Sequence, residues 1–154
     1  MVDRKHMKTI DHIKGVADKN SGFSLIELMV VTAIVAIIAS IALPTYTQYV
    51  LRGKVANGLS GLMNAKLKME NYYQDNRIYS CTIIGSNFDS TNFTYSCATS
   101  NSGQNFTLTA TGTNSAPNFV YTIDDTGTKH TSSVGTGWTG APKDCWITKS
   151  IGSC

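Results

Sequence analysis

One acidic side chain, Glu27, lies inside an otherwise uncharged apolar run that covers residues 23–43. As an α-helix, about 21 residues span roughly 32 Å, which matches the thickness of a bilayer core. An ionised carboxylate within such a segment costs about 2.5–3.5 kcal/mol unless another group satisfies it. Cleavage between Gly22 and Phe23 would create an α-amino group one helical turn before Glu27. That amine could pair with Glu27 of the same chain or of a neighbouring copy, and the second arrangement would join identical subunits into a polymer.

The acidic residue belongs to a longer motif, Gly22-Phe23-Ser24-Leu25-Ile26-Glu27-Leu28-Met29-Val30-Val31, with Pro44 further on. This motif resembles the class III signal of type IV pilins and pseudopilins. The resemblance implies that a membrane prepilin peptidase cleaves after Gly22, removes residues 1–22 as a leader and methylates the new terminus, Phe23. It also implies that Glu27 registers an incoming subunit in a filament and that the helix has a hinge at Pro44.

Two other interpretations of the N-terminal region remain open. An ordinary secretory signal could be cut after Ala42, although the apolar stretch before that site is long for a signal peptide and contains Glu27. The segment could also be a membrane anchor that is never cut. Translation could begin at Met1 or at Met7. The small basic excess of the leader favours keeping it in the cytoplasm and exporting the remainder.

All the cysteines follow the apolar segment, at positions Cys81, Cys97, Cys145 and Cys154. This distribution suits an oxidising compartment and two disulfides. Four cysteines allow three connectivities, and we favour the local one, in which Cys81 pairs with Cys97 and Cys145 with Cys154. Each such bond would close a short loop and contribute about 3 kcal/mol on the loop-entropy model.

After Pro44 the sequence becomes amphipathic. Apolar residues recur at helical spacing at Leu51, Val55, Leu59, Leu62, Ala65, Met69 and Tyr72. We therefore expect one helix over about residues 24–73, ending at Asp75-Asn76. Its first half, residues 23–50, would lie in the membrane or the filament core, and its second half would back the sheet of a globular head, residues 51–154. Three glycines in this helix (Gly53, Gly58 and Gly61) weaken it but permit close packing.

The rest of the head has the alternating pattern of strands. Residues 80–104 resemble an irregular loop in which Phe93, Tyr95 and Cys97 alternate, so that a short strand can form there. Strands are then expected near residues 106–110, 120–124 and 128–134, with turns between them. The tail, residues 135–154, would form a disulfide-closed flap against the sheet edge. The predicted fold class is therefore α+β, and the family resemblance implies the same arrangement of a long helix on an antiparallel sheet of three to four strands.

Several other patterns have the residue types of functional sites but not their context. Gly135, Gly137 and Gly140 match a dinucleotide fingerprint, yet no helix follows them. Asp124 and Asp125 are too few for a calcium site, and hairpin chemistry explains them. His130 is the only histidine after the leader, so neither a zinc cluster nor a catalytic triad can be built around it. We therefore predict no enzyme, no catalytic residue, no metal and no cofactor.

Basic residues give the second half of the helix a mildly positive character, at Arg52, Lys54, Lys66, Lys68 and Arg77. Most of the net charge of +3 lies in the leader, so the mature chain is nearly neutral and is not a dedicated nucleic-acid domain. A solvated face or contacts to neighbouring subunits explain these cations, and DNA binding is the alternative. Resemblance to minor pilins is carried by two further segments, the aromatic run Tyr72-Tyr73-Gln74-Asp75-Asn76-Arg77 with Tyr79, and the Asp-Thr-Gly-Thr turn with its later Cys-Trp.

The sequence thus predicts a structural subunit, and more specifically a minor pilin, of a type IV pilus used for motility, adhesion or DNA uptake. The alternatives are a DNA-binding receptor pilin of a competence pilus, a major pilin or a type II secretion pseudopilin. The resemblance implies three partners, namely other pilin subunits, the prepilin peptidase and an inner-membrane assembly platform. It also implies storage in the inner membrane before assembly and a place in the surface pilus afterwards.

Overall fold

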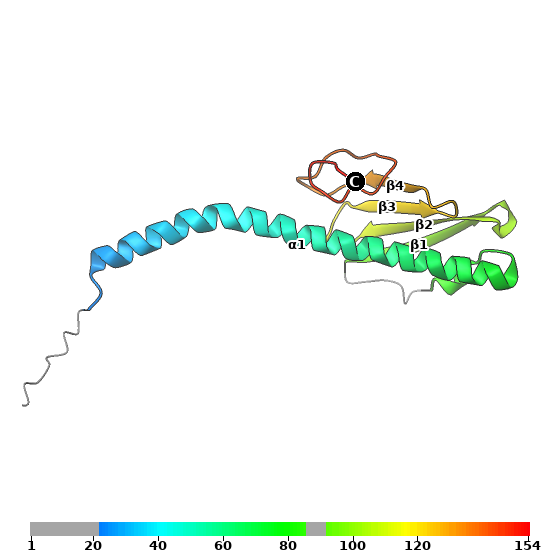
Figure 1. Cartoon of the computed structure of the whole chain (residues 1–154), viewed down its shortest axis with the longest axis horizontal. Helices are drawn as coiled ribbons and strands as arrows, with labels where there is room; N and C mark the ends of the chain where they lie inside the picture. The colour runs from blue at the N-terminus through cyan, green and yellow to red at the C-terminus, as the bar shows by residue number, and fades with distance from the viewer. Residues whose placement is uncertain (1–21, 86–91) are drawn as a thin grey trace, which may run out of the picture. The chain divides into compact units, whose positions relative to one another are not determined.

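The computed structural model describes residues 22–85 and 92–154 of the chain. One long helix, α1 (Leu25–Asn76), is followed by four strands, β1 (Phe93–Ser100), β2 (Asn105–Gly112), β3 (Val120–Asp124) and β4 (Lys129–Ser133). Short 3₁₀ turns, η1 (Cys81–Ile83) and η3 (Asn101–Gly103), lie before and after β1. The chain divides into two compact units, Met1–Ala39 and Ser40–Cys154, and we describe each by itself. Figure 1 shows the order of these elements.

The first unit contributes the start of α1, which is apolar and exposed. Leu25, Ile26 and Leu28 all have more than half of their surface accessible. A polar residue inside this stretch is satisfied locally, since the Thr32 hydroxyl donates hydrogen bonds to the carbonyls of Leu28 and Met29 at 3.0 Å. By its length and apolar composition, α1 is the one candidate membrane span among the described residues. Residues 1–21, which are all but the last residue of the predicted leader, lie outside the described residues.

In the second unit α1 continues through Pro44 without a break in the helix. Proline lacks an N–H and crowds the preceding turn, and two threonines donate hydrogen bonds to nearby carbonyls. The Thr45 hydroxyl donates to Ile41 O at 3.1 Å and the Thr47 hydroxyl to Pro44 O at 2.9 Å. A hinge at Pro44 therefore stays a prediction. The helix ends at Asn76, where Arg77 takes a left-handed conformation with φ of 60°.

The sheet is an antiparallel meander in the order β1-β2-β3-β4. Strands β1 and β2 pair along their whole length, from Phe93 opposite Gly112 to Ser100 opposite Asn105. The β3–β4 pairing shifts register between Val120 and Tyr121. Beyond β4 the chain returns to its edge, where Thr131 forms an isolated bridge with Lys143. The tail thus lies against the sheet edge, as the sequence predicted.

The second half of α1 packs along the sheet (Figure 1). The residues predicted from helical spacing form the helical side of the core, because Val55, Leu59, Leu62, Ala65 and Met69 are all buried. The sheet and loops supply the other side through residues that are at most 1% exposed: Phe93, Phe106, Leu108, Ala110, Phe119, Tyr121 and Ile123. The predicted fold class, a long helix on an antiparallel sheet with a disulfide in the C-terminal region, is confirmed.

Two helix glycines bring β1 close to α1. A Cβ on Gly58 would lie 2.5 Å from the Phe93 ring, and a Cβ on Gly61 would overlap the Tyr95 side chain. The Tyr95 hydroxyl also donates a hydrogen bond to Gly58 O at 3.0 Å. Gly53 differs, since nothing lies within 4 Å of its Cβ position. The close packing expected of small helix residues therefore occurs at two of the three glycines.

Within residues 80–104, the short strand that the alternation of Phe93, Tyr95 and Cys97 allowed is present and is longer than expected. The eight residues of β1 form a regular edge strand, paired with β2 throughout. The reason is that only the N-terminal end of β1 is buried, so the apolar half of its alternating pattern is short and the rest consists of serine, threonine and alanine. Residues 86–91 of this segment lie outside the described residues.

Gly58→Ala should destabilise the head although alanine favours a helix by about 1 kcal/mol over glycine. The added methyl group overlaps the buried Phe93 ring, and overpacking of this kind costs about 1–3 kcal/mol. Gly53→Ala is the matched control, because it makes the same change on the same helix in open space and should be neutral or stabilising. Urea unfolding of the two variants measures the difference. Equal stability of both would contradict the packing described here.

Candidate functional site

Glu27 lies in the first turn of α1, directly after the predicted cleavage position. Its amide and that of Leu28 donate to Ser24 O at 3.1 and 3.2 Å, which begins the helix. Among the described residues, an ion pair joins Lys66 to Glu70, and Asp144 contacts His130; neither contact includes Glu27. A carboxylate is favoured at a helix N-terminus by the backbone dipole. Gly22 and Phe23 precede the helix, and Phe23 is 79% exposed.

The helix around Glu27 exposes an apolar surface that its own chain does not cover. We call residues 23–50 the assembly segment. Its exposed large apolar side chains are Phe23, Leu25, Ile26, Leu28, Met29, Val30, Val31, Ile34, Val35, Ile37, Ile38, Ile41, Leu43, Tyr46, Tyr49 and Val50. A surface of this kind marks contact with a membrane or a partner protein. Glu27 is the one acidic residue within it.

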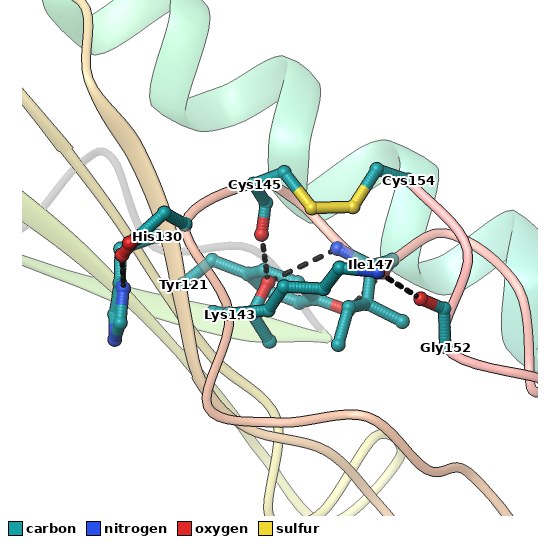
Figure 2. The surroundings of a disulfide bond; sticks show 9 residues. Tyr121, His130, Lys143, Cys145, Ile147, Gly152 and Cys154 are labelled. Atoms are coloured by element: carbon teal, nitrogen blue, oxygen red, sulfur yellow. Dashed lines mark hydrogen bonds and ion pairs between the residues drawn. A yellow bond between two sulfur atoms is a disulfide. The ribbon is translucent and has the colours of Figure 1, made fainter.

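A second notable region is the C-terminal disulfide loop, residues 145–154, which Cys145 and Cys154 close (Figure 2). The buried Thr131 of β4 holds this loop through its hydroxyl, which donates to Cys145 O at 2.6 Å and accepts from Ile147 N at 3.0 Å. Tyr121 of β3 donates from its hydroxyl to Ile147 O at 2.8 Å. The loop is therefore a fixed part of the head rather than a loose tail.

Four cations lie on or against the C-terminal disulfide loop. Lys129 lies over the Trp146 ring at 4.8 Å, Arg52 donates to Ser150 Oγ at 3.3 Å, and Lys143 donates to Gly152 O at 2.9 Å. The fourth, Lys149, is exposed within the loop. One acidic residue, Asp144, also lies beside the loop, and its Oδ1 is 2.8 Å from His130 Nδ1. The loop therefore presents a locally basic surface on a nearly neutral head.

The other disulfide joins Cys81 to Cys97 and ties η1 to β1. Both disulfides thus have the local connectivity favoured from the sequence. Near the first one, the Tyr79 ring stacks on Tyr73 at 4.5 Å and meets Phe106 edge-on at 4.6 Å. The Tyr79 hydroxyl donates to Glu70 Oε2 at 3.1 Å. These aromatics seal the end of the helix to the sheet, as expected, although Tyr73 and Tyr79 are only partly buried.

The alternative sites found in the sequence have ordinary structural roles. The Asp125 carboxylate accepts from Asn105 Nδ2 at 3.0 Å and from Phe106 N at 3.3 Å, and the Asp124 carboxylate accepts from Thr126 and Thr128. These carboxylates thus stabilise the β3–β4 turn. The glycines at 135, 137 and 140 lie in an irregular loop. Residues 22–85 and 92–154 contain no group of three or more metal-ligating side chains.

Family models agree with this arrangement. The model for the prokaryotic N-terminal methylation motif matches residues 18–43, which include Gly22, Phe23 and Glu27. The model described as "Type IV minor pilin ComP, DNA uptake sequence receptor" matches residues 44–120, half of the chain. The chain belongs to the type IV pilin family. The apolar helix of such a subunit anchors it in a membrane before the subunit becomes part of the pilus.

Individual relatives of this pilin match it over shorter stretches. The type IV major fimbrial protein FimA of Dichelobacter nodosus is 41% identical over 64 residues, which are 42% of this chain and 38% of the relative's own length. A type IV pilin from Shewanella oneidensis matches in structure with a TM-score of 0.45 and 22% identity, covering 51% of this chain and 89% of its own. The minor pilin PilV of Neisseria meningitidis matches with a TM-score of 0.49 and 21% sequence identity. This match covers 58% of this chain and 93% of PilV.

Sequence reasoning assigned two lysines of this pilin to a solvated helix face or to contacts with neighbouring subunits, whereas the structure shows both in contacts within the chain. Lys66 donates to Glu70 and to the carbonyls of Asp124 and Asp125, so it holds the β3–β4 turn against the helix. Lys54 is half-buried and donates to Ser115 O at 3.0 Å. The spacing of 58 and 61 residues between these partners left no local signal in the sequence. The contact between His130 and Asp144 was also missed, because these residues are 14 positions apart in the sequence.

Burial raises the pKa of Tyr121 well above its ordinary value of 10.0, and burial together with the Glu70 hydrogen bond raises the pKa of Tyr79 to about 12. Both phenols are therefore neutral in the folded pilin at a pH where the unfolded chain ionises. Their contribution to stability is complete below pH 10 and falls as pH rises above it, by up to about 1.4 kcal/mol per pH unit for Tyr121.

Urea unfolding of the wild-type head and of Tyr121→Phe at pH 9, 10 and 11 tests this effect. The wild type should be more stable at pH 9, where its hydroxyl bonds to Ile147 O, and the difference should shrink as pH rises. The lysines titrate alike in both proteins and cancel in the comparison. A difference that stays constant over this range would contradict the assignment.

Proposed function

We propose that this pilin is a non-catalytic structural subunit, specifically a minor pilin, that is cut after Gly22 and methylated at Phe23. In the filament, the new amine of one subunit would neutralise Glu27 of its neighbour. The single observation that carries the proposal is the uncovered apolar surface of the assembly segment, with one acid in it. The minor role is supported by the description of the family model over residues 44–120.

The assembly segment needs two different environments in turn. In the inner membrane, lipid covers its apolar side chains, and the cost of the Glu27 carboxylate is offset when a cation lies at the same depth. In a filament, the same side chains pack against neighbouring helices, where a low dielectric strengthens an amine–carboxylate pair. Equivalent groups in related subunits lie at equivalent depths, so the pair also fixes the axial register. The proposed division into leader, assembly segment (23–50) and head (51–154) follows from this.

Glu27→Val should leave cleavage and membrane insertion intact and strongly lower filament yield. Valine suits the apolar segment but leaves the neighbour's amine without its partner. Thr32→Val is the matched control, since it replaces another polar residue of the same segment whose hydrogen bonds are confined to its own helix. Filament yield is measured from sheared surface fractions, and processing from the size of the membrane-bound chain. Normal filament yield for Glu27→Val would refute the pairing.

A second candidate function, DNA binding in an uptake pilus, is favoured by two observations taken together. The matching family model is described as a DNA uptake sequence receptor, and the C-terminal disulfide loop carries four cations on or against it. Phosphate contacts by lysine and arginine give binding that is strongly salt-dependent. A tip or fibre that repeats this surface would multiply a weak affinity.

The double variant Lys129→Gln with Lys149→Gln should weaken DNA binding by the head and reduce its salt dependence, by roughly one unit of log–log slope for each lysine that no longer neutralises a phosphate. Lys68→Gln, an exposed helix residue away from this loop, is the control and should bind as the wild type does. Fluorescence anisotropy with a labelled duplex at several salt concentrations measures both quantities. Absence of binding at low salt, or equal weakening in both variants, would remove the DNA hypothesis while leaving the structural one.

A further inference from the structure

A pocket of about 370 Å³ lies in the unit Ser40–Cys154, beside α1. Its helical wall includes Tyr46, Val50, Leu51 and Lys54, and the opposite wall comes from the β2–β3 loop with Phe119 and from the segment after β4 with Thr136. Cavities of roughly 300–1,000 Å³ are the usual size of small-molecule sites. The pocket is therefore large enough to hold part of a small amphipathic molecule.

The pocket combines apolar walls with one cation. No acidic residue is among those that line it. Lys54 donates one hydrogen bond, to Ser115 O at 3.0 Å, whereas an ammonium group carries three N–H donors. Within residues 22–85 and 92–154, no carboxylate pairs with Lys54. A half-buried cation of this kind is complementary to an anion that enters with an apolar body attached.

The pocket's place along the chain indicates where such a molecule comes from. The apolar run ends at Leu43, and Tyr46 follows three residues later, which is about 4.5 Å along a helix. Tyr46 and Tyr49 are 67% and 76% exposed, and tyrosine is enriched where a membrane meets water. Arg52 and Lys54 come next, and side chains of this kind can extend their charged ends to the membrane surface while their stems lie along apolar groups. While the helix spans the bilayer, Tyr46 at the near end of the pocket lies at the depth of the lipid headgroups. Lys54 follows about 12 Å further along the helix, and its long side chain, which tilts toward the helix N-terminus, extends back toward the membrane surface.

We propose that this pocket binds an anionic phospholipid of the membrane that stores the subunit. The phosphate contacts Lys54 Nζ, and the upper part of an acyl chain lies along Tyr46, Val50 and Leu51. The apolar segment of a second copy fits the charge less well, because its only acid, Glu27, is one the proposed function already assigns to an amine. The lipid site rests on membrane storage of the subunit and not on its minor role or on DNA binding.

The test uses the full mature chain in detergent, with native mass spectrometry after addition of phosphatidylglycerol or phosphatidylcholine. The wild type should retain phosphatidylglycerol in preference to phosphatidylcholine. Lys54→Met keeps the aliphatic stem and removes the charge, so it should lower phosphatidylglycerol retention about tenfold and abolish the preference. Lys68→Met makes the same change of charge on the same helix outside the pocket and should retain lipid as the wild type does.

A second variant tests the cavity itself without a change of charge. Thr136→Phe fills the pocket from an exposed loop position and should lower retention of phosphatidylglycerol as well. Equal retention by Lys54→Met and Lys68→Met, or no preference for the anionic lipid in the wild type, would overturn the proposal. So would unchanged lipid retention with reduced filament yield in Lys54→Met and Thr136→Phe, because the pocket would then receive a neighbouring subunit. The lipid readout is made on unassembled protein, so failure of filament assembly does not affect it.

Discussion

An apolar helix surface that its own chain leaves exposed is the constraint on which the rest of this pilin depends. The assembly segment places one large apolar side chain after another in contact with solvent, and burial of such surface is the main favourable term in association. Lipid or neighbouring helices must cover it. Burial of apolar surface is non-directional, so it favours association more than it selects one relative position. In the proposed filament Glu27 would supply the register, since a carboxylate in an apolar medium accepts few positions for its partner.

In the head, the second half of the same helix is buried against the sheet instead of being exposed. Beyond residue 50, α1 buries a single stripe, and its glycines let the aromatic side chains of β1 approach the backbone. A small domain has a limited core, so the disulfides and the Thr131 hydroxyl matter to it. They tie the segments after α1 and after β4 to the sheet. The result is a cross-linked head on the second half of the helix, while the first half of the helix leaves its apolar surface exposed.

Local patterns in the sequence predicted most of this fold. The 3.6-residue spacing of Val55, Leu59 and Leu62 gave the buried helix face, and the alternation around Tyr121 and Ile123 gave the central strands. What the sequence could not supply were contacts between distant segments. Lys54 and Lys66 both donate to backbone carbonyls of remote turns, and carbonyls have no sequence signature. The regular pairing of β1 was underestimated because most of its side chains are small and polar.

The candidate site divides in the same way. Gly22, Phe23 and Glu27 could be found because they lie close together in the sequence at fixed offsets. The basic surface of the C-terminal disulfide loop could not be found in this way, because its residues come from α1, β4 and the tail.

The most direct test of the central claim is intact-mass spectrometry of the chain recovered from native filaments. The account predicts a polypeptide that begins at Phe23, carries one added methyl group and contains two oxidised cysteine pairs. A polypeptide that begins elsewhere, or one without the added methyl group, would contradict it.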